Sequence, residues 1–271
     1  MFRFRVGHED IRSGQKRLPA IARQVAVSPD RALKLSIVAP TLNEAENIPL
    51  LVTEIERTLV GTDFEIIISD DDSPDQSWLV AERIAGMNSR VRVLRRTAKK
   101  GLGWSVIDGF DAAKGDILAC IDADLQHDPA ILPRMCEELN KGADLVVGSR
   151  YISGGSVGRW GPVRVAESWL ASRLAQRFVA TKICDPMSGY FLLRRGDFLR
   201  VRDRLNGQGF KILLEIAANM PGAIVSEVPY TFRSRIAGKT KLSGRVVFAY
   251  IAQLRRLRCK SAEGGTSSEI V

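Results

Sequence analysis

Residues 117–129 read ILACIDADLQHDP, an apolar run followed at once by acidic and amide side chains. The apolar part predicts a buried strand over residues 117–121, so the acidic cluster stands where a strand ends. Because successive strand side chains point to opposite faces, Asp122 and Asp124 are expected on the same side. Together with Gln126 they offer the oxygen ligands that Mg²⁺ or Mn²⁺ prefers, although a solvated acidic turn is an equal alternative for this motif alone.

The rest of the chain alternates predicted strands with predicted helices. Strands are predicted at residues 35–39, 64–68, 91–94, 117–121 and 144–148. Helices are predicted at residues 48–59, 77–85, 105–113 and 129–141, with Asn43 and Ser77 as caps of the first two. This alternation predicts an α/β fold with a doubly wound, mainly parallel sheet, in which ligands bind at the carboxyl ends of the strands.

The composition limits the kinds of molecule that the protein is expected to bind. The 271 residues include 40 Lys and Arg against 31 Asp and Glu, a formal net charge of +9. This excess favours an anionic partner: nucleic acid, an anionic membrane surface or a phosphorylated substrate. No nucleic-acid-binding motif appears, and the acidic clusters gather at strand ends, which argues against nucleic acid. The four scattered cysteines and the lack of an apolar signal sequence predict a cytoplasmic protein with reduced thiols.

The turns after the first two predicted strands are also polar. Residues 40–44 read PTLNE and residues 70–75 read DDDSPD. A carboxylate at the second turn can accept hydrogen bonds from a ribose or a base, whereas a simple capping turn is the alternative for the first. The GLG sequence at residues 101–103 resembles the start of a dinucleotide fingerprint, but Val106 stands where that motif needs glycine, which excludes a nicotinamide cofactor.

Taken together, these motifs resemble the family-two glycosyltransferases of the glycosyltransferase-A fold. Within that family they are most similar to the polyprenol-phosphate (dolichol-phosphate) mannosyltransferases. The resemblance rests on PTLNE, Asp71 with SPD, and DADLQH, and is strengthened by GSRY at 148–151, DPMSGY at 185–190 and GFKILLE at 209–215. It implies one catalytic domain at 33–242. The composition of the flanking residues predicts an N-terminal extension at 1–32, a basic amphipathic helix at 243–260 and a disordered tail at 261–271.

The resemblance assigns roles residue by residue. The nucleotide-sugar pocket would be lined by Pro40, Leu42, Glu44, Asp71, Asp122, Ala123, Asp124, Lys211 and Arg235. Leu42 replaces an aromatic residue common in the family, so only a backbone contact with the base is expected there. The metal, Mg²⁺ or Mn²⁺, would be held by Asp122, Asp124 and Gln126. The acceptor phosphate would be bound by Arg150, Arg164 and Ser168. The catalytic set would be Asp122, Asp124, Arg150, Lys211 and Arg235.

The implied reaction moves a hexose, with inversion, from a nucleotide-sugar donor to a polyprenol or dolichol monophosphate. Mannose from GDP-mannose is the first expectation. Glucose or another hexose from a uridine diphosphate donor is the alternative, and an inactive nucleotide-sugar-binding regulator is the alternative of another class. The acceptor phosphate is mostly ionised near neutral pH, so no strong base is needed. His127 is therefore expected to support the start of a helix rather than to take a proton.

Two apolar stripes suggest contact with a membrane surface. They lie at residues 166–178 and 247–257, and the second stands beside the basic residues Arg255, Arg256, Arg258 and Lys260. Such basic amphipathic helices can lie on an anionic surface, although core packing is the alternative for each helix alone. No apolar run reaches the roughly 20 residues that a membrane span needs. We therefore expect peripheral membrane association, with a separate membrane subunit as a further potential partner.

Overall fold

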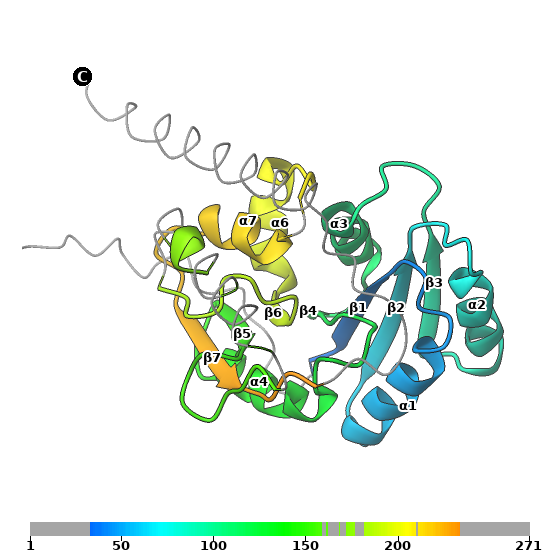
Figure 1. Ribbon diagram of the computed structural model, residues 1–271, viewed down its shortest axis with the longest axis horizontal. Coiled ribbons are helices and arrows are strands. Elements are labelled where there is room, and N and C mark those ends of the chain that lie inside the picture. Colours follow the sequence, from blue (N-terminus) through cyan, green and yellow to red (C-terminus); the bar gives the residue numbers. More distant parts are fainter. Residues whose placement is uncertain are drawn as a thin grey trace, which may run out of the picture. The chain divides into compact units, whose positions relative to one another are not determined.

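The computed structural model describes residues 33–158, 161, 168, 172–176, 182–209 and 211–233. Over these residues the chain forms a seven-stranded sheet of order β3-β2-β1-β4-β6-β5-β7 (Figure 1). The strands are β1 Leu35–Thr41, β2 Phe64–Asp70, β3 Val91–Arg95, β4 Ile117–Cys120, β5 Leu145–Ser149, β6 Phe191–Arg194 and β7 Val225–Pro229. Strand β6 runs antiparallel to both β4 and β5, and the other pairs are parallel. The predicted mainly parallel sheet is confirmed.

Helices cover both faces of the sheet (Figure 1). One face carries α1 Ile48–Thr58, α2 Ser77–Met87 and α4 Leu132–Asn140, the last preceded by a 3₁₀ turn at Pro129–Ile131. The other carries α3 Leu102–Ala112, α6 Arg195–Val201 and α7 Ile212–Ala218, with a 3₁₀ turn at Arg202–Arg204 after α6. Among the residues placed here, no helix is long and apolar enough to cross a bilayer.

The alternation of side chains in β1 shows why the sheet needs both layers. Leu35, Ile37 and Ala39 pack in the cluster that includes α1, whereas Val38 packs in the cluster that includes α3. Both faces of this strand are therefore apolar, and it reads as a nearly continuous apolar run in the sequence. This is why periodicity located β1, β2, β4 and β5 to within a residue or two.

Two predicted helix caps are wrong. Helix α1 begins at Ile48, so its N-cap position is Asn47 and not Asn43. Asn43 has a left-handed backbone, with φ +55°, and its N–H donates to the hydroxyl of Ser73. Ser77 is already the first residue of α2, and its N–H and hydroxyl both donate to Asp75. Asn43 therefore lies four positions before the N-cap of α1, and the Ser77 hydroxyl is bonded to Asp75, so neither side chain caps its helix.

Six loops meet at one edge of the sheet because of the strand directions. The parallel strands β1, β2, β4, β5 and β7 end at this edge, and the antiparallel β6 begins there. The turns after the first two strands, the DADLQH loop, the GSRY turn, the DPMSGY loop and the chain after Pro229 therefore come together. The domain boundaries expected at residues 242 and 260 lie outside the described residues and stay predictions.

Candidate active site

The acidic loop after β4 is shaped by hydrogen bonds within itself. Strand β4 ends at Cys120, one residue earlier than expected, so strand alternation does not place Asp122 and Asp124. Instead the N–H of Gln126 donates to Oδ1 of Asp124 over 3.1 Å, and the N–H of Asp122 donates to Nδ1 of His127 over 3.2 Å. Leu125, between them, has a left-handed backbone with φ +60°. The loop is therefore a tight turn that presents its oxygen-bearing side chains from one short segment.

The imidazole ring of His127 fixes this loop by packing against buried aromatic side chains. Its ring stacks on Tyr190 at 5.2 Å between centroids and meets the edges of Tyr230 and Phe232. Burial lowers the pKa of His127 to about 4, so the imidazole is neutral at neutral pH. Its Nδ1 accepts the N–H of Asp122, which places the remaining proton on Nε2. The imidazole of His127 therefore holds the backbone of Asp122 in place, and because of its low pKa it is a poor base.

Gly189, in the DPMSGY loop, lies directly against the carboxylate of Asp122. A Cβ atom at this position would stand 2.7 Å from Oδ2 and 2.8 Å from Oδ1 of Asp122. The neighbouring Ser188 hydroxyl donates to the carbonyl of Gly148 over 2.7 Å, which fixes this loop to the end of β5. Only glycine leaves room for the carboxylate in the position that it takes here.

Arg150, after β5, is held by a buried carboxylate. Its Nε donates to Oδ2 of Asp185 over 2.7 Å and its Nη2 donates to Oδ1 over 2.8 Å. Burial would by itself lower the pKa of Arg150, but the ion pair with Asp185 outweighs it and raises the pKa, so the guanidinium stays charged. Asp185 in turn is fully buried. The pair fixes the direction of a cation at the edge of the site.

Lys211, just before α7, lies in the same group of charges. Its Nζ donates to the carbonyl of Met187 over 2.8 Å. The pKa of Lys211 is lowered overall. Burial lowers it most and the charge of Arg150 lowers it further, whereas the carboxylates of Asp122 and Asp185 partly offset both effects. These interactions place two cations and two carboxylates within electrostatic reach of one another.

The predicted acceptor residues are placed in part. The hydroxyl of Tyr151, next to Arg150, donates to Oγ of Ser168 over 2.7 Å, so the structure brings Ser168 close to the GSRY turn. Arg164 and Arg235 lie outside the described residues, and their roles stay predictions.

Of the predicted nucleotide residues near β1, Pro40 lies in the strand itself, whereas Leu42 and Glu44 lie in the turn after it, which contacts α2. The N–H of Glu44 donates to the hydroxyl of Ser77 over 2.8 Å, and Oε2 of Glu44 accepts a hydrogen bond from Asn47 over 2.7 Å. Glu44 is buried, whereas Leu42 is 40% exposed and Pro40 is half-buried. Leu42 thus presents an apolar surface at the strand end, and Glu44 fixes the turn that carries it.

Asp71 is part of a network that sequence reasoning missed. It forms an ion pair with the buried Arg96, and its Oδ2 accepts the N–H of Gly101 over 2.6 Å. Arg96 also donates to Asp108 over 2.8 Å and to the carbonyl of Lys99 over 2.7 Å. Arg96 follows β3, and the only sequence signal for it was a basic residue at a parallel strand end.

The side chains of the acidic loop suit a hard divalent cation. No three His, Cys, Asp or Glu side chains cluster as a metal site within the described part of the chain. The predicted set instead comprises two carboxylates, Asp122 and Asp124, and the amide of Gln126. Such a set leaves coordination positions for water and substrate phosphate, which is how Mg²⁺ and Mn²⁺ are usually bound. The side chain of Asp122 is 34% exposed, so a ligand can reach it.

Replacing Gly189 tests whether the position of Asp122 matters. We expect Gly189→Ala to displace the carboxylate and weaken Mn²⁺ binding by about tenfold, the lower end of the effect of disturbing a ligand's support. Gly196→Ala is the matched control, because a Cβ there meets nothing within 4 Å. Titration calorimetry with Mn²⁺ and a thermal unfolding scan measure both variants. Equal Mn²⁺ affinities would show that Asp122 does not hold the metal in this position.

A family match covers most of the catalytic region. Residues 36–202 match the family described as glycosyl transferase family 2. The dolichol-phosphate mannosyltransferase of Pyrococcus furiosus is 41% identical over 228 residues, which are 83% of this chain and 64% of that protein. The dolichol-phosphate mannosyltransferase of Saccharomyces cerevisiae is 36% identical over 83% of this chain and 87% of its own length. The undecaprenyl-phosphate mannosyltransferase of Micrococcus luteus is 33% identical over 83% of this chain and 93% of its own length.

Solved structures share the fold. Glucosyl-3-phosphoglycerate synthase from Mycobacterium tuberculosis, in complex with Mn²⁺, UDP-glucose and glycerol 3-phosphate, has a TM-score of 0.58 and 22% identity, covering 84% of this chain and 79% of its own. Mannosyl-3-phosphoglycerate synthase from Rubrobacter xylanophilus has a TM-score of 0.61 and 17% identity, covering 88% of this chain and 77% of its own. These likenesses confirm the predicted glycosyltransferase-A fold. The chain belongs to glycosyl transferase family 2.

Proposed function

We propose that the chain is an inverting, metal-dependent glycosyltransferase that moves mannose from GDP-mannose to a polyprenol or dolichol monophosphate. One observation carries the proposal: the acidic loop, Lys211 and the Arg150–Asp185 pair meet at a single edge of the sheet. This arrangement offers a cation site for the donor diphosphate beside fixed positive charge for an acceptor phosphate. The sugar and the lipid come from the names of relatives that align with 83% of this chain and with most of their own length.

The proposed reaction depends on neutralising the negative charge of the leaving diphosphate and of the acceptor phosphate. When bound to the acidic loop, Mg²⁺ or Mn²⁺ would neutralise the diphosphate as it leaves. Lys211 adds positive charge near Asp122, where the departing phosphate is expected. Arg150 holds the acceptor phosphate oxygens, and its orientation is set by Asp185. The acceptor phosphate, with a second pKa of about 6, is already a nucleophile at neutral pH, so a neutral His127 is compatible with the reaction. Attack on the anomeric carbon from the side opposite the diphosphate inverts its configuration.

The donor base has a defined place in this proposal. The Asp71 carboxylate, fixed by Arg96 and Gly101, lies at the end of β2 beside the turn that carries Leu42. A carboxylate there can accept hydrogen bonds from the N–H groups of a base. Purified protein assayed with GDP-mannose and with UDP-glucose decides between the two donors. Faster transfer from UDP-glucose would favour the glucosyltransferase alternative, and no transfer from either would favour a nucleotide-sugar-binding regulator.

The first expected outcome concerns the metal loop. Asp124→Ala should abolish mannosyl transfer to a polyprenol phosphate, because it removes one of the two carboxylates while the loop stays anchored by His127. The assay follows radiolabelled mannose into the lipid fraction at saturating Mn²⁺, and circular dichroism checks that the variant is folded. Unchanged turnover in a folded variant would contradict the metal-dependent mechanism.

A second outcome separates donor from acceptor. Arg150→Ala should raise the KM for polyprenol phosphate by about tenfold or more, since a bidentate-capable arginine on phosphate contributes roughly 1.5–3 kcal/mol. The Kd for GDP should rise by a smaller factor, and a thermal unfolding scan checks that the variant, which leaves the buried Asp185 without its ion-pair partner, is folded. Asp185→Asn should shift the acceptor KM in the same direction, because it weakens the ion pair that orients Arg150. Equal losses for GDP and acceptor would move Arg150 to the donor side.

We also propose that the protein binds the membrane surface peripherally. The sequence places Arg255, Arg256, Arg258 and Lys260 beside the end of an apolar stripe, and each basic residue near an anionic surface contributes roughly 1 kcal/mol. Binding to anionic vesicles should weaken at high salt and be lost on truncation after Gly244. Vesicle flotation measures this. Equal flotation of the full chain and the truncated chain would remove the C-terminal segment from the proposal, and no flotation of either would favour a membrane-embedded partner subunit.

A further inference from the structure

The chain after β7 is tied to the acidic loop by a reciprocal pair of hydrogen bonds. The N–H of Arg233 donates to the carbonyl of Gln126 over 2.9 Å. The side-chain amide of Gln126 donates back to the carbonyl of Arg233 over 3.1 Å. On its other side the same chain pairs with Ser156, which exchanges backbone hydrogen bonds with Tyr230 and Phe232. The backbone at residue 233 is therefore held from two directions.

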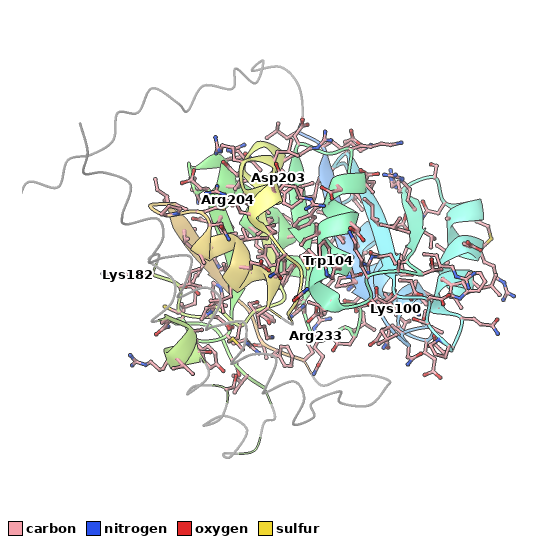
Figure 2. All side chains as sticks on the ribbon, turned by 90° about the horizontal axis from the view of Figure 1, so that it is seen from above. Lys100, Trp104, Lys182, Asp203, Arg204 and Arg233 are labelled. Atoms are coloured by element: carbon pink, nitrogen blue, oxygen red, sulfur yellow. The ribbon has the colours of Figure 1, made fainter. Side chains whose placement is uncertain are left out.

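The side chain of Arg233, which is labelled in Figure 2, makes a second connection to the acidic loop through ion pairs. Its Nη1 donates to Glu54 of α1 over 2.9 Å, and its Nη2 lies 2.8 Å from Oδ1 of Asp128, at the far end of the acidic loop. The Arg233 side chain is 38% exposed, so each ion pair contributes only modestly to stability. These ion pairs matter mainly because they fix positions: one guanidinium joins α1 to the end of the acidic loop.

This arrangement decides which atom of Gln126 is available to a cation. An amide carries one NH₂ group and one oxygen, and only the oxygen can bind Mg²⁺ or Mn²⁺. Since the NH₂ group is committed to the Arg233 carbonyl, Oε1 is the atom turned to other partners. A shift of the backbone at residue 233 would remove the bond that fixes this orientation.

We propose that Arg233 is a positioning residue for the metal loop. By joining Glu54 of α1 to Asp128 it holds its own backbone beside Gln126, and that backbone keeps the amide oxygen of Gln126 available to a metal ion. This inference rests on the proposed function, because it takes the metal role of Gln126 from it.

Arg202 offers a matched control. It is also partly exposed, and it forms a comparable ion pair with Asp111, 2.6 Å between Nη2 and Oδ2, in the layer of α3 and α6 on the other face of the sheet. Arg202→Ala therefore removes a similar interaction without touching the acidic loop. Glu54→Gln serves as a milder second variant, because it loosens the anchor of Arg233 and leaves the backbone pair with Gln126 intact.

The experiment measures Mn²⁺ binding to the full chain in the presence of GDP, by electron paramagnetic resonance, alongside transfer kinetics. We expect Arg233→Ala to weaken Mn²⁺ binding by about tenfold, as disturbed support of metal ligands typically does. It should raise the donor KM and leave the acceptor KM unchanged, whereas Arg202→Ala should match the wild type. Glu54→Gln should shift Mn²⁺ binding in the same direction by a smaller factor, and Arg233→Lys, which can keep one ion pair, should recover part of the loss.

Equal Mn²⁺ affinities in Arg233→Ala and Arg202→Ala would overturn the inference, as would a defect confined to the acceptor KM. If Arg233→Ala does not fold, wild-type Mn²⁺ binding in Glu54→Gln would overturn it in the same way. A wild-type protein that binds Mn²⁺ and GDP but transfers no sugar would instead count against the proposed function, and the binding comparison would still decide the role of Arg233.

Discussion

The buried ion pair between Arg150 and Asp185 is the interaction on which the acceptor half of the site depends. Burying two charges is unfavourable unless they are well bonded, and removal of one partner from such a pair typically costs about 3–5 kcal/mol. Here Asp185 accepts the N–H, Nε and Nη2 of Arg150, and its own N–H donates to Glu227 in β7. The DPMSGY loop is thereby fixed to two strands. That loop carries Gly189 against Asp122 and the carbonyl that binds Lys211.

The three consecutive acids at the end of β2, Asp70, Asp71 and Asp72, show how much a sequence pattern can predict. Asp70 is fully buried and accepts hydrogen bonds from Thr41 and Ser73, so it fixes the turn. Asp71 pairs with Arg96 inside the site, whereas Asp72 turns outward to Arg95 and Lys100. The pattern located the cluster and the resemblance selected Asp71. Neither could say which basic residues hold each acid, because those residues come from the next strand and loop.

The same limit applies to the fold. The first five strands were predictable because their apolar runs are bounded by turn residues. Strands β6 and β7 were not predicted: β6 spans only Phe191–Arg194, and β7 reads VSEVP, with polar residues in a partly buried strand. The acidic loop was found from its motif. Arg233 was missed because its partner Glu54 lies 179 residues away, a separation at which local patterns carry no information.

The reversed direction of β6 divides the sheet into two working halves. On one side β3, β2, β1 and β4 run parallel and carry the turns proposed for the nucleotide; on the other, β5 and β7 carry the turn proposed for the acceptor. The two halves meet along the hydrogen-bonded seam between β4 and β6. Two contacts cross this seam, Gly189 against Asp122 and Arg233 at Gln126, so a substitution at either position acts on both halves of the site.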